Sequence, residues 1–236
     1  MPGGLVGVGV GPGAPDLLTL RAIAACRAAD RVFGPTMAPD AEGRAESILR
    51  AAAPDIAVER LVFAIRQDEA ARAQAHAAAA ARVVSCLDAG QRVAFVTLGD
   101  PNVYSTFHHL ASAVRRHRPA TVVTTVPGIM AFQEVAARNG TTVTDGTEGL
   151  KIISAVGGAD GVAEALREDC AAVVIYKGGR HLPEIAAHLE RAGRLDDAVV
   201  GELMGLADER VGAAAAFAGA PAAYLATVVV PPKRPA

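Results

Sequence analysis

The stretch "GVGVGPGAPDLLTL", residues 7–20, decides the fold class of this chain. Residues 5–10 are apolar or glycine, which is typical of a short buried strand, and glycine recurs at every second position up to Gly13. Residues 17–29 carry apolar side chains at helical spacing, with Asp16 and Thr19 placed where side-chain oxygens cap free amides. A strand, a glycine-rich loop and a helix in this order predict an α/β fold.

The same alternation of strand and helix continues along the chain. Residues 93–98 form a nearly continuous apolar run, as in a parallel strand covered on both faces, and residues 120–128 predict another buried strand. We therefore expect a mostly parallel sheet. The expected strands are 5–10, 30–34, 60–65, 93–98, 120–128, 150–156, 171–179, 198–205 and 223–230. The expected helices are 17–29, 44–53, 68–89, 104–116, 129–139, 160–168 and 182–192.

A polar, glycine-rich segment divides this pattern. Residues 139–149, "NGTTVTDGTEG", lack periodicity, and the strand and helix pattern restarts after them. We expect an N-terminal α/β domain over residues 1–142, which carries the Gly/Pro-rich loops, and a C-terminal α/β domain over residues 148–236.

Composition and charge exclude several classes of protein. Hydrophobic residues make up 51% of the chain, which is enough for a folded core, and a net charge of −2 gives no reason to expect a nucleic acid or a membrane surface as partner. Pro12 and the glycines interrupt the first apolar stretch, so we expect no signal peptide and no spanning helix. Three widely spaced cysteines predict buried thiols in a reducing cytoplasm.

Three loops that follow predicted strands are the candidate binding site. They are "GPGAPD" (11–16), "LGDPNVYSTF" (98–107) and "VPGIMAF" (126–132). Because ligands of open α/β sheets bind outside the carboxyl ends of the strands, these loops should share one edge. Each combines Gly with Pro, which gives rigid backbone that a ligand can approach closely. Backbone of this kind with the Asp100 carboxylate suits a ligand with hydroxyls and a cationic centre.

A dinucleotide is the alternative ligand for the first loop. Gly9, Gly11 and Ala14 match the loose form of the dinucleotide-binding pattern. However, Pro12 and Pro15 remove amide donors that should face phosphate oxygens, and the second predicted strand ends without the acid that would bind ribose. No phosphate-binding P-loop motif is present either.

Together, "GVGVGPGAPDLLTL", "LGDPNVYSTF" and the following "VPGI" resemble the tetrapyrrole methylases, which are S-adenosylmethionine-dependent enzymes of corrin and sirohaem synthesis. The resemblance covers nearly the whole chain, including "VIYKGG" and the last apolar strand. Within the family, "LGDPNVYSTF" and "LVFAIRQD" look most like the precorrin-2 carbon-20 methyltransferases of cobalamin synthesis.

The resemblance implies a homodimer of two-domain subunits, with S-adenosylmethionine in the cleft between the domains and precorrin-2 or cobalt-precorrin-2 as substrate. At Met130 the family pattern leads us to expect a small hydroxyl residue instead. The residues that the resemblance places at the cofactor are Pro12, Gly99, Asp100, Val103, Ser105, Thr106, Met130, Ala131, Tyr176, Leu203 and Ala226.

The tetrapyrrole would lie beside Gly11 and Gly13, and its carboxylates would pair with Arg66, Lys177 and Arg180. The expected reaction is in-line methyl transfer to an electron-rich ring carbon, so the protein mainly positions the reactants and excludes water. Tyr104, Asp100 or a water molecule could accept the carbon-20 proton. His108 and His109 point in different directions on a helix, so we expect no metal site. His109 could face the substrate side, but packing or a surface position is favoured for it.

Other functions stay open at this point. The chain could methylate another corrin-ring carbon, or it could be a nucleotide-dependent oxidoreductase that binds NAD. It could also be a sensor that binds the cofactor without catalysis. Substrate and cofactor tests separate these hypotheses.

Overall fold

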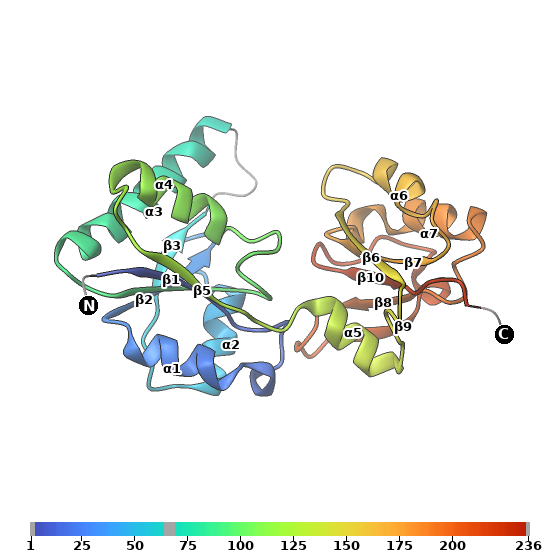
Figure 1. The fold of residues 1–236 in the computed structure, drawn as a ribbon, viewed down its shortest axis with the longest axis horizontal. Coiled ribbons are helices and arrows are strands. Elements are labelled where there is room, and N and C mark those ends of the chain that lie inside the picture. Colours follow the sequence, from blue (N-terminus) through green and yellow to red (C-terminus); the bar gives the residue numbers. More distant parts are fainter. Residues whose placement is uncertain (1–2, 64–68, 235–236) are drawn as a thin grey trace. The chain divides into compact units, whose positions relative to one another are not determined.

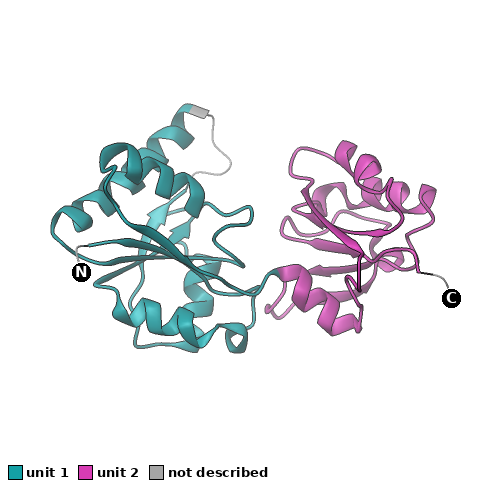
Figure 2. Ribbon diagram, in the orientation of Figure 1, with its two compact units in different colours: residues 1–130 teal, residues 131–236 magenta. Residues whose placement is uncertain are grey.

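The computed structural model describes residues 3–63 and 69–234 of the chain. The chain divides into two compact units, Met1–Met130 and Ala131–Ala236, which Figure 2 draws in different colours. Each unit contains a five-stranded sheet with helices on its faces (Figure 1). The predicted α/β class is confirmed.

The sheet of the first unit is parallel throughout, as expected for strands that alternate with helices. Its strand order is β3-β2-β4-β1-β5, so the opening strand lies next to both β4 and β5. The strands are β1 (Leu5–Gly9), β2 (Arg31–Thr36), β3 (Glu59–Val62), β4 (Val93–Thr97) and β5 (Val123–Val126).

Helices cover both faces of this sheet (Figure 1). After the short 3-10 helix η1 (Pro15–Leu17), α1 (Leu20–Ala28) and α2 (Arg44–Ala52) cover one face. The other face is covered by α3 (Glu69–Asp88) and α4 (Phe107–His117). Thr19 caps α1 as predicted, because its hydroxyl accepts a hydrogen bond from the Ala22 amide at 3.1 Å.

Strand β5 differs from the buried strand that the sequence predicts. Thr124 and Thr125 are exposed, and Val122 just before the strand is 61% exposed. The reason is position, because β5 pairs only with β1 and forms the edge of its sheet. An edge strand lacks the second neighbour that would cover it, and polar threonines suit this location.

The second unit contains a mixed sheet of order β6-β7-β10-β8-β9. Only β6 and β7 pair in parallel; the other pairs are antiparallel, so the mostly parallel arrangement predicted from the sequence holds for the first unit alone. The strands are β6 (Gly149–Ser154), β7 (Ala171–Tyr176), β8 (Val199–Glu202), β9 (Arg210–Ala213) and β10 (Thr227–Val230).

The boundary between the two compact units, after Met130, lies before the segment 139–149 that the sequence analysis chose. Helix α5 (Ala131–Asn139) packs on β8 and β10, with Val135 against Gly201, so it belongs to the second unit and not to a domain of residues 1–142. On the other face of this sheet lie the helices α6 (Asp160–Ala165) and α7 (Leu182–Arg191), with the 3-10 turns η2 (Gly179–His181) and η3 (Ala214–Phe217).

Within the described residues, no helix combines the length and apolar character needed to cross a membrane.

Three glycines allow the chain to pack backbone against backbone where β1, β4 and β5 end. A Cβ atom on Gly9 would collide with the Gly99 carbonyl oxygen and the Gly128 amide, and one on Gly128 would collide with the same carbonyl. Gly99 itself has φ of 67°, a conformation that favours glycine. These positions need glycine for the close approach and for the turn.

We predict that Gly128→Ala lowers the free energy of unfolding by about 1–3 kcal/mol, because the added methyl must push two loops apart. Thermal unfolding followed by circular dichroism measures the effect. Gly157→Ala is the matched control, since a Cβ atom there meets nothing within 4 Å. Equal unfolding midpoints for the two variants would contradict the proposed backbone contact.

Candidate functional site

The three predicted loops lie next to each other because β4, β1 and β5 are parallel neighbours. Gly11 and Gly99 form an isolated bridge, in which the Gly99 amide donates to the Gly11 carbonyl at 2.8 Å. The Gly128 amide donates to Asp100 Oδ2 at 3.1 Å. The first loop is thus bonded to the second, and the second to the third.

Asp100 holds two segments of backbone with its carboxylate. Oδ2 accepts from Gly128, and Oδ1 accepts from the Asn102 amide at 2.8 Å, which closes a turn inside the second loop. The Asn102 side chain donates to Thr125 Oγ1 at 3.2 Å and adds a second link to β5. The sequence predicts Asp100 as a ligand contact; the structure shows that this carboxylate braces the loops.

Hydroxyls fill the base of the second loop. Ser105 Oγ lies 2.8 Å from Thr97 Oγ1 and accepts a hydrogen bond from the Phe107 amide at 3.1 Å, so it caps the first turn of α4. Val103 and Thr106 are half-buried beside it. These hydrogen bonds hold the second loop close to the end of β4.

Backbone strain coincides with predicted site positions. Among the described residues, the non-glycine residues with positive φ are Tyr104 (47°), Lys177 (58°) and Leu203 (54°). This conformation costs about 1–2 kcal/mol for a residue with a Cβ atom, and strain of this kind clusters at functional sites. All three are residues for which the sequence predicts a role at the site. Tyr104 is in addition 47% exposed.

In the second unit, Tyr176, Leu203 and Ala226 come together at one edge of the sheet. Tyr176 ends β7, Leu203 follows β8, and Ala226 precedes β10, which lies between those two strands. The register places Tyr176 opposite Thr227, and Thr227 opposite Gly201. The structure therefore brings these three predicted cofactor residues to neighbouring strand ends.

Tyr176 is a half-buried phenol that holds the start of a helix. Its hydroxyl oxygen accepts a hydrogen bond from the Phe132 amide at 3.3 Å, which gives a partner to one of the free amides at the start of α5. Burial raises the pKa of Tyr176 from 10 to about 12, and the hydrogen bond from Phe132 opposes this shift. A phenol of this kind is neutral at physiological pH and suits packing and hydrogen bonding.

The cationic residues proposed for the substrate have different environments. Lys177 is half-buried, and burial lowers the pKa of its ammonium group. Arg180 is exposed, with its guanidinium 5.9 Å from the centre of the Tyr224 ring. Arg66 lies outside the described residues. No group of three or more potential metal-binding side chains is found in residues 3–63 and 69–234.

Sequence reasoning missed Glu202, a buried acid at the end of β8. It is 3% exposed, pairs with Arg210 of β9, and accepts a hydrogen bond from the Ala223 amide at 2.6 Å. Arg210 also lies over the Phe217 ring, 4.8 Å from its centre. Glu202 thereby fixes the segment before Ala226. The sequence feature that could have revealed Glu202 is its charge inside the otherwise apolar run 198–205.

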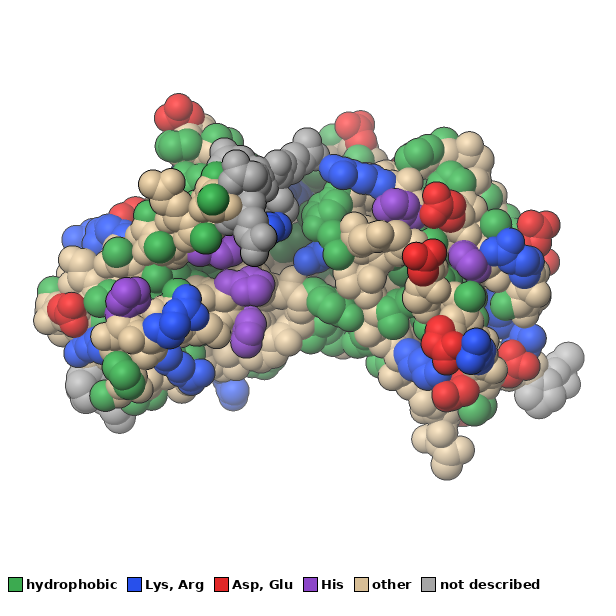
Figure 3. Space-filling model, turned by 90° about the horizontal axis from the view of Figure 1, so that it is seen from above, with side chains coloured by type: hydrophobic (Ala, Val, Ile, Leu, Met, Phe, Trp, Pro, Cys, Tyr) green, Lys and Arg blue, Asp and Glu red, His purple; other side chains and the backbone are tan. Residues whose placement is uncertain are grey.

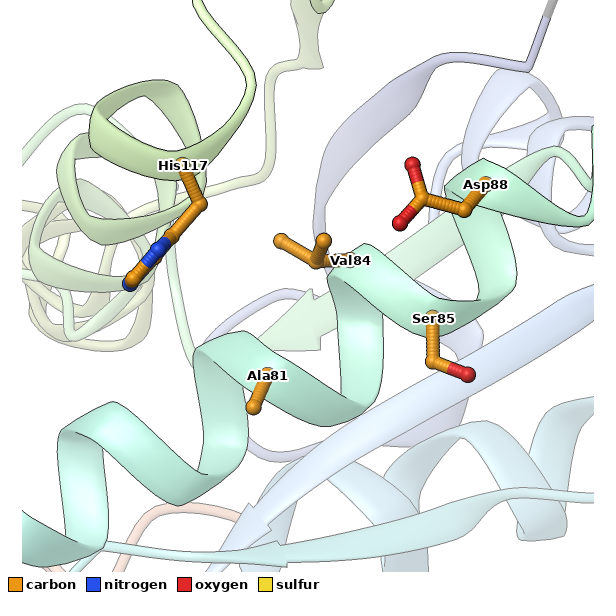
Figure 4. Close-up of a pocket in the computed structure, with 5 residues that line it drawn as sticks. All are labelled: Ala81, Val84, Ser85, Asp88 and His117. Carbon is orange, nitrogen blue, oxygen red and sulfur yellow. The ribbon is translucent and has the colours of Figure 1, made fainter.

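A cavity of about 330 Å³ lies elsewhere, between α3 and α4 (Figure 4). Its lining comes from the last turns of both helices, which lead into the amino ends of β4 and β5 and therefore lie at the opposite edge of the sheet from the loops. None of its residues was predicted for the site. The lining residues are Ala81, Val84, Ser85, Asp88 and His117.

Comparison with known proteins identifies the family. Residues 4–218 match the family model of Tetrapyrrole (Corrin/Porphyrin) Methylases. The chain belongs to this family. The resemblance drawn from the three loops is confirmed.

Two relatives and one solved structure extend this assignment. The chain is 33% identical to precorrin-2 C(20)-methyltransferase of Sinorhizobium sp, over 97% of this chain and 95% of the relative. It is 30% identical to cobalt-precorrin-2 C(20)-methyltransferase of Salmonella typhimurium, over 85% of this chain and 83% of the relative. A putative cobalamin synthesis related protein (CobF) from Corynebacterium diphtheriae has the same fold, with a TM-score of 0.70 and 19% identity over 98% of this chain and 99% of that one.

Removal of the Asp100 carboxylate should weaken ligand binding by the loops. Asp100→Ala leaves the amides of Gly128 and Asn102 without their acceptor, so we expect a strong loss of S-adenosylmethionine affinity in titration calorimetry. Asp40→Ala, at an exposed position of the same unit, serves as the control. Wild-type affinity in the Asp100→Ala variant would remove Asp100 from the site.

The Tyr176 phenol should titrate far above the usual range. The difference between the ultraviolet titration curves of the wild type and Tyr176→Phe isolates this side chain, and its midpoint should lie near pH 12. We also expect the variant to lose about 1 kcal/mol of stability, because the Phe132 amide loses its partner. Tyr224→Phe is the control, and a Tyr176 midpoint near pH 10 would contradict the burial argument.

Proposed function

We propose that this tetrapyrrole methylase transfers a methyl group from S-adenosylmethionine to carbon-20 of precorrin-2, giving precorrin-3A in cobalamin biosynthesis. The observation that carries the proposal is the 33% identity, over nearly the full length of both chains, to a Sinorhizobium protein named for this reaction. The order and chemistry of the three loops are consistent with it.

The loops fit S-adenosylmethionine better than a phosphate cofactor. No Lys or Arg occurs in residues 11–16, 98–107 or 126–132, so the loops offer no cation for a polyphosphate. They offer backbone groups and the hydroxyls of Ser105 and Thr106 instead. A Cβ atom on Gly99 would meet nothing within 4 Å, so the backbone there is open to close approach. An electroneutral or acidic surface suits a ligand with a positively charged sulfur.

Bound S-adenosylmethionine would supply an electrophilic methyl group on a sulfonium. The chain's own contribution is to hold both reactants, because the ring carbon of precorrin-2 is already electron-rich. Loops braced by Asp100 keep their geometry when ligands bind, and such preorganisation lets the reacting atoms meet at about 3–3.5 Å. In the second unit, Tyr176, Leu203 and Ala226 are the proposed cofactor contacts. Gly11 and Gly13 are the proposed contacts with the tetrapyrrole.

The proton that leaves carbon-20 needs an acceptor. Tyr104, Asp100 and a water molecule are the candidates. Both oxygens of Asp100 already accept backbone hydrogen bonds inside the site, whereas Tyr104 is about half exposed at the strained centre of the loop. These observations favour Tyr104 or water over Asp100.

A second candidate substrate is the cobalt-loaded form of precorrin-2. The Salmonella typhimurium relative, 30% identical, is named for that substrate. The homodimer and the cytoplasmic location expected from the sequence stay predictions.

The test is incubation of the purified chain with S-adenosylmethionine carrying a labelled methyl group and with anaerobically prepared precorrin-2, with or without cobalt. We expect one added methyl by mass spectrometry, located at carbon-20 by NMR. In the same assay Tyr104→Phe should lower kcat if the phenol accepts the proton. Methylation at another carbon would change the proposed target, and cofactor binding without methylation of either form would reject both substrates.

A further inference from the structure

Three imidazoles from two helices form a cluster in the first unit. The rings of His76 (α3) and His109 (α4) are stacked with centres 5.7 Å apart, and the rings of His108 and His109 have centres 5.6 Å apart. His76 is half-buried against Phe63, with 5.2 Å between ring centres, while His108 and His109 are exposed. Figure 3 shows histidine side chains gathered on the face of this unit that α3 and α4 cover.

The cluster lies on the side of the unit where the candidate loops lie. His108 and His109 stand in the first turn of α4, which begins where the loop 98–107 ends. Helix α3 begins after the carboxyl end of β3, at the same edge of the parallel sheet, and packs against α4. The imidazoles therefore stand beside the second loop and near the positive end of the α4 dipole.

The described charges that act on His76 share one sign. Burial lowers the pKa of His76, and the positive charges of His109 and Arg72 lower it further. Two described acids of the packed elements, Glu59 of β3 and Asp88 of α3, pair with Arg82 and Arg118 and not with the imidazoles. The stacked His76 and His109 rings and the edge-on His108 ring repel each other and Arg72 when protonated, so an anion is the partner that would balance their charge.

We infer that His76, His108 and His109, with Arg72, form a binding site for side-chain carboxylates of the tetrapyrrole. The inference rests on the proposed function and adds to it a set of residues that recognise the substrate's acidic groups. A carboxylate accepts hydrogen bonds from protonated imidazoles and balances their charge. Recognition is then strongest where the imidazoles are protonated and weakens as pH rises.

The test uses uroporphyrin III, a stable tetrapyrrole with carboxylates on every ring, as the probe. Its affinity for the full chain is measured by fluorescence at pH 6 and pH 8. We expect binding about tenfold tighter at pH 6, which corresponds to a rise of about one pKa unit in one imidazole on binding. The propionate and acetate groups of the probe stay ionised across this interval, so the change reports on the protein.

The variants are His76→Gln, His109→Gln and the double variant His108→Gln/His109→Gln. The double variant should lose most of the pH dependence and bind at pH 6 about as weakly as the wild type does at pH 8, and each single variant should lose part of it. His117→Gln is the matched control, an exposed histidine at the other end of α4. Since His108 and His109 are exposed, their double variant keeps the test valid even if His76→Gln does not fold.

Wild-type affinity and wild-type pH dependence in the double variant would overturn the inference. S-adenosylmethionine affinity, measured by calorimetry, should be unchanged in all variants. Failure of the wild-type chain to methylate precorrin-2 would count against the proposed function alone, because the porphyrin titration needs no turnover. With an active wild type, the variants should raise KM at pH 6 and leave kcat unchanged.

Discussion

The close approach of backbone at Gly9, Gly99 and Gly128 is the constraint on which the candidate site of the first unit depends. Strands β4, β1 and β5 lie side by side, and their outgoing loops can touch only where no Cβ atom intervenes. Asp100 then bonds the second loop to the third through the Gly128 amide. The three loops are therefore held together by main-chain contacts and by one carboxylate, and none of these contacts depends on a long flexible side chain.

Local sequence patterns predict much of the fold. They do not predict which strands, far apart in the sequence, pair with each other. The apolar run at 93–98 and the glycine-rich loop after β1 give clear signals because strand, turn and helix preferences act over a few residues. The exposure of β5 depends on its having one neighbour, which its own residues do not encode. Strand β9 is four residues long and lacks a run of apolar side chains. The amphipathic pattern of α5 predicts packing, but not on which sheet.

Residues of the candidate site could be predicted where they lie in a recognisable sequence motif. The turn at Asp100 and the residues around Tyr176 follow from short sequence patterns, whereas the buried Glu202 and its pairing with Arg210 depend on an antiparallel neighbour. Positive φ at Tyr104, Lys177 and Leu203 has no signature in the side chains. The sequence predicts surface or packing positions for His108 and His109; that His76 from another helix stacks on His109 requires the tertiary structure.

The central position of β1 has a consequence for the synthesis of the protein. Leu5 pairs with Val93 and Val123, so β1 leaves the ribosome long before either of its neighbours exists. Parallel pairing across such separations carries a large loop-closure cost and is slow. Until residues 93–97 emerge, an apolar strand with two open edges is accessible to other chains. The strand that organises the binding loops is therefore also the segment of the nascent chain that most needs protection from aggregation.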